Sequence, residues 1–399
     1  MKEKIRQIIS IVIFFAILWI PVCTFRQPGH VSIVENKITA TMPAIAKENL
    51  LQQEWVAAVE DCITDNMGMK EEATLLYISG MYKIFDDIAI ANYVEGTDGH
   101  IFYLTDAILS DLQGNQSLTN YEEFEEALLT LQSSFSQRDC EFFFMPIPNK
   151  ESLYWENFPE TISGSPENTM LHQLILKLEE TTSGLNIVPV EEKMLEHKQD
   201  GELLYYRNID ASHWNSYGMY IGYQALMEEM QRVVPSLSYF KEGEVTITRQ
   251  EQQQAFLYLQ SYDLIHKTFL DFADYVYQVM PVNGWHWVQD NTQPAGFILA
   301  GDTQDLYFHY SNPLAKNEGC LVIYGDSYIY TFMLPMLAET FSEVYFINAN
   351  SCSTTELTDL LQYVDPDYFL FEAVARQLNA ARIYDLLAVI QDSVDAVSG

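Results

Sequence analysis

The chain has 399 residues, of which 48 % are hydrophobic and 13 % aromatic, and its formal net charge at pH 7 is −35. This composition supplies a packed core and excludes an intrinsically disordered chain. The strong acidity disfavours binding to nucleic acid and to anionic membrane surfaces. We therefore expect one large folded domain or two smaller ones, without a nucleic-acid partner.

The N-terminus has the pattern of a membrane-targeting segment. Lys2, Lys4 and Arg6 precede the apolar stretch Ile8–Cys23. Basic residues before an apolar segment keep the N-terminus in the cytoplasm. No convincing small-x-small cleavage site follows, so an uncleaved signal anchor over 1–24 is favoured over a cleaved signal peptide. Either alternative places the rest of the chain on the extracytoplasmic face of the membrane, anchored or secreted.

The cysteines are widely spaced and show no metal-ligand pattern. Their spacing does not define a disulfide pairing, and we expect those outside the anchor to be ordinary buried thiols. No phosphate-binding glycine-rich loop is present, so we expect neither a metal nor another cofactor. The five are Cys23, Cys62, Cys140, Cys320 and Cys352.

A stalk and N-terminal helices are predicted over 25–90, with helices at Gln52–Asp65 and Lys70–Ile90. The main domain is predicted over 91–399. Its first element is a β-hairpin, because the turn at Asp98-Gly99 lies between two apolar runs.

The main domain alternates predicted helices and buried strands, which favours a doubly wound parallel sheet covered by helices on both faces. The helix at 216–233 has apolar residues at three- and four-residue spacing. Residues 240–315 interrupt the alternation, with a helical pattern over Glu251–Val279, and we interpret them as an insertion. The other predicted helices are Tyr121–Ser134, Thr169–Glu180, Thr331–Phe341, Thr355–Tyr363 and Asn379–Val394, and the strands are Glu141–Met145, Asn186–Val190, Leu321–Tyr324, Val344–Ile347 and Tyr368–Phe371.

Gly325-Asp326-Ser327 lies between a predicted strand and a predicted helix. Ligands of parallel sheets bind outside the carboxyl ends of the strands, so Ser327 is a candidate nucleophile. The three residues alone are a weak signal, expected by chance in roughly one chain in ten of this length. The alternative is that Asp326 or Ser327 only caps the helix that follows.

Asp210 and His213 form a candidate acid–base pair for Ser327. Their spacing of one helical turn lets the carboxylate hold one imidazole nitrogen while the other takes a proton from a serine. Trp214 follows and could wall the site from water. The alternative for His213 is a surface or capping histidine. Another histidine, His286, stands between two tryptophans but has no carboxylate three residues before it.

Together these segments resemble the SGNH hydrolases, with the serine and histidine blocks in inverted order. That order is similar to the alginate O-acetylation proteins and to the DHHW proteins of Gram-positive bacteria. Where those proteins usually have Asp-x-His-Trp or Asp-His-His-Trp, this chain has Asp210 three residues before His213. The other segments that carry the resemblance are Glu35-Asn36-Lys37, Asp98 to Phe102, Pro146 to Glu151, and Tyr206 to Gly218.

The resemblance implies an SGNH-like fold and acyl transfer to carbohydrate by Ser327, His213 and Asp210. It also implies a membrane-bound O-acyltransferase partner that supplies the acetyl group, and a polysaccharide substrate. Further residues are expected to contact substrate, support the site or bind the oxyanion. They are Tyr328, Asn348, Asn350, Glu372, Arg376 and Trp214.

Three functions remain open on the sequence. The leading hypothesis is an extracytoplasmic O-acetyltransferase acting on a cell-surface or exported polysaccharide. The second is a carbohydrate acetyl esterase, because the same catalytic residues can pass the acetyl group to water. The third is a non-catalytic glycan-binding scaffold of a polymer-export complex, with aromatic side chains of 240–315 stacking on sugars.

Overall fold

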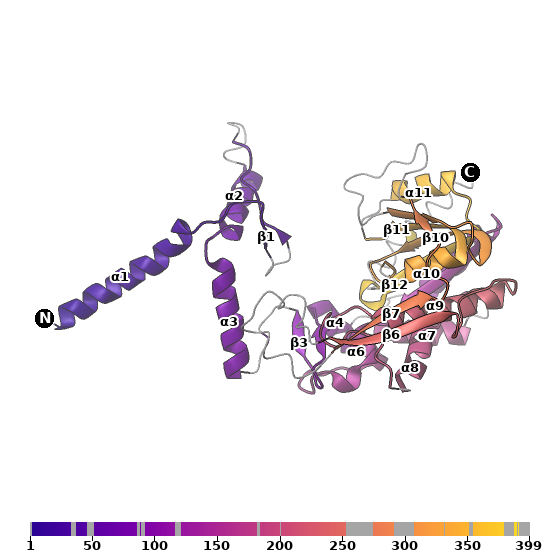
Figure 1. Ribbon diagram of the computed structural model, residues 1–399, viewed down its shortest axis with the longest axis horizontal. Coiled ribbons are helices and arrows are strands. Elements are labelled where there is room, and N and C mark those ends of the chain that lie inside the picture. The colour runs from indigo at the N-terminus through magenta and orange to yellow at the C-terminus, as the bar shows by residue number, and fades with distance from the viewer. Residues whose placement is uncertain are drawn as a thin grey trace. The chain divides into compact units, whose positions relative to one another are not determined.

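The computed structural model of the chain (Figure 1) divides into two compact units. One comprises Met1–Val94 with Gln253–Phe272, and the other Glu95–Gln252 with Ala273–Gly399. The residues that the structure describes are 2–32, 37–45, 52–85, 88, 92–115, 121–181, 184–199, 201–252, 274–290, 307–330, 332–350, 354–378, 387–388 and 390.

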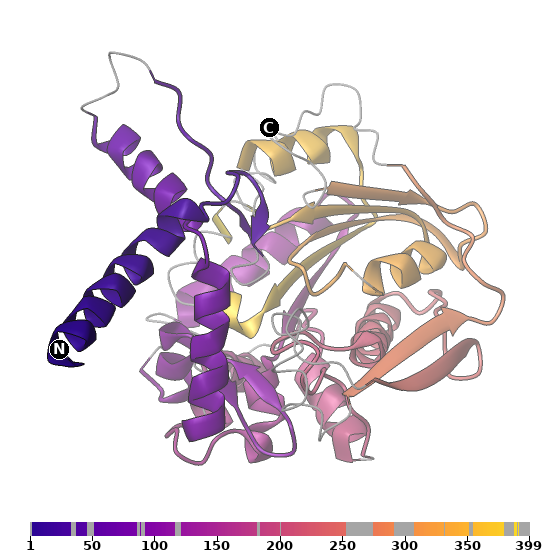
Figure 2. The same cartoon turned by 60° about the vertical axis from the view of Figure 1, so that its left-hand side comes forward.

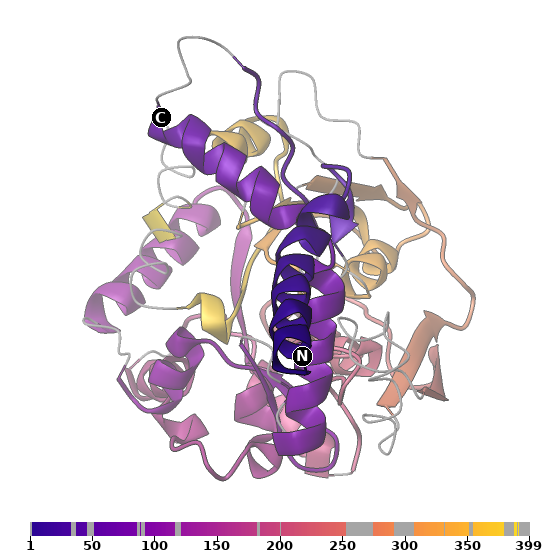
Figure 3. The ribbon, with the colours of Figure 1, turned by 90° about the vertical axis from the view of Figure 1, so that its left-hand side faces the viewer.

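The first unit begins with the single long helix α1 (Lys2–Cys23), drawn in indigo in Figure 3. Its Lys4–Cys23 segment has a mean hydropathy of 2.2 and is not buried, so it is long and apolar enough to cross a membrane. Arg26 forms ion pairs with two glutamates of α3. The other elements are the antiparallel strands β1 (Val31–Ser32) and β2 (Lys37–Ile38) and the predicted helices α2 (Gln53–Asp65) and α3 (Lys70–Phe85).

The predicted hairpin consists of β3 (Tyr93–Glu95) and β4 (Ile101–Tyr103). Its turn contains Asp98 and Gly99 with φ of 53° and 74°. Two successive residues with positive φ match the twist of flanking strands, and glycine adopts this conformation without steric cost.

A six-stranded sheet forms the centre of the second unit (Figure 2), in the order β5-β12-β10-β11-β9-β8. The first four strands are parallel, as predicted, whereas β9 pairs antiparallel with β11 and β8 pairs antiparallel with β9. The sheet is therefore mixed rather than wholly parallel. The strands are β5 (Glu141–Ile147), β8 (Val288–Gln289), β9 (Tyr307–Ser311), β10 (Asn317–Gly325), β11 (Phe341–Asn348) and β12 (Tyr368–Val374).

Helices cover both faces of this sheet, with α11 and α10 on opposite sides in Figure 2. Helices α5, α7 and α11 share one hydrophobic cluster with alternate residues of β5, β10 and β12. Burial of both faces explains why these strands are continuous apolar runs. The helices are α4 (Asp106–Leu112), α5 (Tyr121–Ser136), α6 (Lys150–Leu153), α7 (Met170–Thr181), α8 (Val190–Gln199), α9 (Ser216–Val233), α10 (Met333–Thr340) and α11 (Thr354–Tyr363).

The helix predicted over Glu251–Val279 is wrong at both of its described ends. Glu251 and Gln252 close β6 (Val245–Gln252), which pairs antiparallel with β7 (Asp274–Pro281), the two-stranded ribbon of Figure 3. β7 contains two tyrosines and two valines among its eight residues, a composition that favours a strand over a helix. Residues 253–273, which the same prediction covered, lie outside the described residues.

Two further predictions differ from the structure in extent. The strand predicted over Asn186–Val190 is a single bridge between Ile187 and Phe144, because Pro189 has no N–H to continue the ladder and α8 begins at Val190. Within 240–315, β8 and β9 belong to the central sheet, so at least this part completes the domain rather than interrupting it. The helix predicted over Asn379–Val394 falls largely outside the described residues.

Candidate active site

Ser327 follows β10 and lies in a turn before α10, half-exposed. The N-cap residue of α10 is Phe332, and no side chain caps that helix. Ser327 therefore does not serve as the helix cap that the sequence left open as an alternative. Ser327 lies at the carboxyl end of a parallel strand, where ligands of such sheets bind.

Gly325 and Asp326 shape the turn that presents Ser327. A Cβ at Gly325 would lie 2.6 Å from the Glu372 carboxylate oxygen, so any larger residue here would have to displace the Glu372 side chain. Asp326 Oδ1 accepts a hydrogen bond from the Tyr328 N–H at 2.9 Å, and its Oδ2 accepts one from the Val374 N–H at 3.2 Å. The aspartate thus ties the serine turn to the end of the neighbouring strand.

Asp210 and His213 lie in an irregular loop, not on the helical turn that their spacing suggested. Asp210 Oδ1 accepts hydrogen bonds from the Ser212 and His213 N–H groups, both at 2.8 Å, which closes an Asx turn. That turn brings Asp210 Oδ2 to 3.1 Å from His213 Nδ1. The carboxylate reaches the imidazole across three residues through backbone hydrogen bonds rather than through helical geometry.

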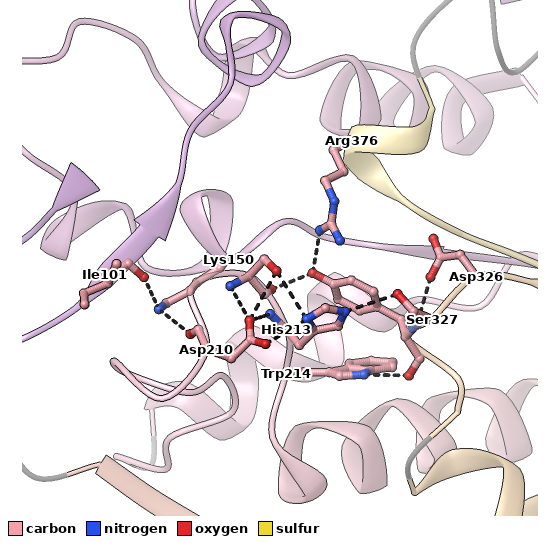
Figure 4. Close-up of polar contacts among 10 residues, drawn as sticks. Ile101, Lys150, Asp210, His213, Trp214, Asp326, Ser327 and Arg376 are labelled. Atoms are coloured by element: carbon pink, nitrogen blue, oxygen red, sulfur yellow. Dashed lines mark hydrogen bonds and ion pairs between the residues drawn. The ribbon is translucent and has the colours of Figure 1, made fainter. Parts of the chain in front are cut away.

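The two halves of the site meet at His213, whose Nε2 lies 3.2 Å from Ser327 Oγ (Figure 4). With Nδ1–H donating to Asp210, Nε2 is an acceptor for the serine hydroxyl. Burial alone would raise the pKa of Asp210, but the hydrogen bond and charge of His213 outweigh it and hold that pKa below its ordinary value of 3.8. The carboxylate is therefore ionised at neutral pH.

Tyr328 and Trp214 brace the contact between the serine turn and the histidine loop. The fully buried Tyr328 donates its hydroxyl proton to the Ser212 carbonyl at 2.5 Å and accepts from Arg376 Nη1 at 2.7 Å. The buried Trp214 donates its indole N–H to the Tyr328 carbonyl at 2.9 Å. Arg376 itself follows β12, and its backbone N–H donates to Asn149 Oδ1.

The buried carboxyl group of Glu372, on β12, holds the backbone of the serine turn by a hydrogen bond. Its Oε2 accepts the Asp326 N–H at 2.7 Å, and its buried Oε1 has no hydrogen-bond partner among the described residues. Burial, together with the charge of Asp326, raises the pKa of Glu372 well above its ordinary value of 4.5. Glu372 is completely buried and packs against the turn.

We predict that E372Q melts at a higher temperature than the wild type at pH 8. Because the folded-state pKa lies above the unfolded value of 4.5, the protonated carboxyl stabilises the fold fully below pH 4.5, and this contribution is lost as the pH rises through the folded-state pKa. Glutamine keeps the acceptor oxygen and never ionises. Thermal melts at pH 4 and pH 8 should show the advantage of E372Q at pH 8 alone; an equal difference at both would refute the argument.

Asn348 ends β11 beside the serine turn, and Asn350 lies in the turn that follows it. Asn348 pairs in register with Gly325, and the intervening Ala349 N–H donates to the Gly325 carbonyl at 2.7 Å. The Asn348 side-chain amide donates to the Tyr330 hydroxyl, and its oxygen accepts the Asn350 N–H at 2.8 Å. Both asparagines therefore stand next to the strand end that precedes the nucleophile.

His286 has a carboxylate neighbour that its sequence context did not reveal. Its Nδ1 lies 3.1 Å from Glu339 Oε2 of α10, and Glu339 also accepts backbone N–H groups of His286 and Trp287. The pair lines a cavity of ≈ 380 Å³ with Phe240, Lys316 and the 281–284 turn. No hydrogen bond joins this pair to Ser327 in the part of the chain that the structure describes.

A second cavity, of ≈ 240 Å³, has Arg376 in its wall. Arg376 offers hydrogen-bond donors there, while Asn149 and Asp111 offer oxygens. Burial raises the pKa of Asp111 to about 6. Because Arg376 also contacts the hydroxyl of Tyr328, the cavity lies one side chain away from the serine turn.

Two buried charges near the site were not singled out from the sequence. Lys150 belongs to the strand-ending segment Pro146–Glu151, whose sequence carries part of the resemblance but indicates no role for the lysine. Asp274 lies in the segment misread as a helix, and nothing in the sequence pattern marks it. Both contact the backbone of the loop that carries Asp210.

The family model for an SGNH hydrolase-like domain, acetyltransferase AlgX, matches residues 94–268. None of the curated proteins compared with the chain matches it. Bacillus cereus PatB1 with a sulfonyl adduct superposes with a TM-score of 0.53 at 14 % identity, covering 73 % of this chain and 98 % of that one. A second PatB1 structure gives 0.52 at 16 % identity, covering 73 % and 99 %. A DHHW family protein from Eubacterium siraeum gives 0.48 at 14 % identity, covering 75 % and 98 %.

The family model confirms the predicted resemblance, and the family model together with the PatB1 structures confirms the SGNH-like α/β fold. The family model describes an acetyltransferase domain, and the residues of this chain that match it include Asp210 and His213. Ser327 lies beyond the matched residues. Its place in the site comes from the geometry of this chain.

Proposed function

We propose that this protein is an extracytoplasmic O-acetyltransferase that moves an acetyl group onto a cell-surface or exported polysaccharide. The observation that carries the proposal is the chain of contacts from Asp210 through His213 to Ser327, with distances of 3.1 and 3.2 Å. These distances are within reach for proton transfer from a serine hydroxyl. The acetyltransferase description of the matched family model supports the direction of the chemistry.

In the first half-reaction, His213 Nε2 takes the Ser327 proton as Oγ attacks the acetyl carbonyl. The donor's leaving group receives that proton from His213 and departs, which leaves an acetyl-serine. In the second half-reaction, His213 takes the proton of a glycan hydroxyl as the glycan oxygen attacks the acetyl-serine. His213 then returns that proton to Oγ as the serine leaves, which gives the acetylated glycan and free Ser327. Asp210 holds the imidazole and stabilises its positive charge during both steps.

The negative charge on the acetyl oxygen needs hydrogen-bond donors at the end of the sheet. We assign this role to backbone N–H groups of the serine turn, with Asn348 or Asn350 as a further donor, because the end of β11 adjoins Gly325. We assign the cavity beside Arg376 to the glycan, since guanidinium, amide and carboxyl groups together suit sugar hydroxyls.

We further propose that α1 anchors the protein and that a membrane-bound O-acyltransferase delivers the acetyl group. The support is the unburied apolar helix Lys4–Cys23, with the basic residues Lys2, Lys4 and Arg6 at its N-terminal end. An anchor of this kind would hold the domain beside a donor enzyme in the same membrane.

Incubating the full-length chain with a chromogenic acetyl ester, with and without an oligosaccharide acceptor, tests the proposal. We expect acetylated oligosaccharide by mass spectrometry and faster ester consumption when the acceptor is present. Ester cleavage with no transfer to any acceptor would instead identify an acetyl esterase. Oligosaccharide binding without either reaction would identify the non-catalytic scaffold.

A further inference from the structure

The loop that carries Asp210 lies between two buried side chains of opposite charge, Lys150 and Asp274. We propose that these two residues position the Asp210–His213 loop for reaction at Ser327, so that His213 stays within reach of the nucleophile. The role rests on the proposed function, and it assigns two residues that do not themselves touch the reacting atoms.

Lys150 binds carbonyl groups of the Asp210 loop, and Figure 4 shows its contact with the Asp210 carbonyl. Lys150 is 1 % exposed, and its Nζ donates to the carbonyl oxygens of Arg207 at 3.0 Å and Asp210 at 3.5 Å. A third donation, at 2.5 Å, goes to the Ile101 carbonyl of β4. An ammonium has three protons, so the three carbonyls match its full donor capacity.

Asp274 holds the same loop by its N–H groups. The residue is completely buried, and its Oδ2 accepts from the Asn208 and Ile209 N–H groups, both at 2.8 Å. Its Oδ1 accepts the N–H of Tyr275 at 2.8 Å. The ammonium thus binds the carbonyls at the two ends of the backbone stretch 207–210, and the carboxylate binds the two N–H groups between them.

The loop needs these partners because it is buried without a sheet or helix to satisfy it. Asn208 is 1 % exposed and Ile209 is 8 % exposed. On the other side, Ile101 N–H donates to the Arg207 carbonyl and Tyr103 N–H donates to the Ala211 carbonyl, so β4 secures only part of the backbone. Buried backbone groups left without partners are costly, and charged partners make the stronger hydrogen bonds.

Loss of either charge would let the loop shift relative to the serine turn. Asp210 reaches His213 through hydrogen bonds of this same loop, so the two residues would move together. A displacement of about 1 Å can lower the rate of an enzymatic step about 100-fold without abolishing substrate binding. The signature of a positioning role is therefore a lower kcat with little change in KM.

The ammonium should be charged near neutral pH. Burial lowers the pKa of Lys150 to about 8, while Asp274, Asp210 and Glu151 oppose that shift and Arg207 adds to it. Above this pH the amine is neutral and has two protons to donate instead of three. The advantage of the wild type over a variant without the amine should therefore shrink from pH 7 to pH 9.

The test uses K150M and D274N in the full-length chain in detergent, with K150R as the conservative variant. K198M is the matched control, because Lys198 also donates to a backbone carbonyl and lies over an aromatic ring but does not contact the Asp210 loop. The readouts are the rate at which a fluorophosphonate labels Ser327, kcat and KM for a chromogenic acetyl ester, and hydrogen exchange of residues 204–214.

We expect K150M and D274N to lower labelling and kcat about 10- to 100-fold with KM changed less than about threefold. We also expect faster exchange in 204–214, partial rescue in K150R, and no effect of K198M. If K150M does not fold, the results for D274N and K150R test the positioning role. Labelling and kcat within twofold of wild type in the folded variants would overturn the positioning role.

Failure of the proposed function gives a different result. If wild-type Ser327 is labelled but no acetyl group reaches a glycan, the proposed function fails, and the labelling rates of the variants still decide the positioning role. If wild-type Ser327 is not labelled at all, both are overturned.

Discussion

S327A is expected to lose acetyl transfer and acetyl-ester cleavage by about 10⁴-fold or more, because the covalent intermediate forms on that hydroxyl. The fold should remain intact, since Ser327 is half-exposed and does not cap α10. Initial rates with a chromogenic acetyl ester, and mass spectrometry of the acetylated protein, measure the two consequences.

S342A is a suitable control for this result. Ser342 lies at the start of β11, at the end of the parallel strands opposite to Ser327, where its hydroxyl donates to the Gly319 carbonyl. The control should keep wild-type activity. An S327A protein with full acetyl transfer would show that the nucleophile is elsewhere and would remove the basis of the proposed function.

D210N is expected to lower kcat by about 10³- to 10⁴-fold. The amide of asparagine would present its own N–H groups to His213 Nδ1, which favours the tautomer that carries its proton on Nε2. That proton faces Ser327, so the imidazole can no longer accept the serine hydroxyl proton. The measurement is the steady-state rate at pH 7 alongside circular dichroism, which should show an unchanged fold.

D367N is the matched control, because Asp367 holds the Cys320 N–H at 2.7 Å near the far end of β10 and does not contact His213. It should retain wild-type activity. A D210N protein within about tenfold of wild type would mean that Asp210 only shapes the loop through its bonds to the Ser212 and His213 N–H groups. The departure from the usual Asp-x-His-Trp spacing would then mark a different carboxylate arrangement.

D210N should also lose part of the pH dependence of stability. Because the folded-state pKa of Asp210 lies below its ordinary value of 3.8, the ionised carboxylate stabilises the fold above that pH. This contribution is lost as the pH falls through the folded-state pKa. Thermal melts between pH 3 and pH 7 should fall less steeply for D210N than for the wild type.

The elements with strong local signals were predicted well. The helix at 216–233 is observed with the same bounds, and the buried strands of the parallel core lie where their apolar runs indicated. Asn215 explains the sharp start of that helix, because its side chain accepts the Tyr217 and Gly218 N–H groups. Local periodicity and capping suffice where neighbouring residues determine the conformation.

The segments that failed depend on partners distant in the sequence. β6 and β7 are strands because they pair with one another, and β9 joins the sheet beside β11, although its sequence lies in a segment read as an insertion. A strand whose partner is many residues away in the sequence need not show any pattern of its own that identifies that partner.

The sequence by itself determined the two blocks of the candidate site, with Ser327 after a buried strand and His213 just before a helix. Tertiary structure decided that His213 lies 3.2 Å from Ser327, that Asp210 reaches it through an Asx turn, and that Lys150 and Asp274 enclose the loop. The physical reason is that local backbone conformation depends mainly on the residue types within a short segment. The hydrogen bonds of a buried irregular loop can be completed only by charges that the fold brings from elsewhere.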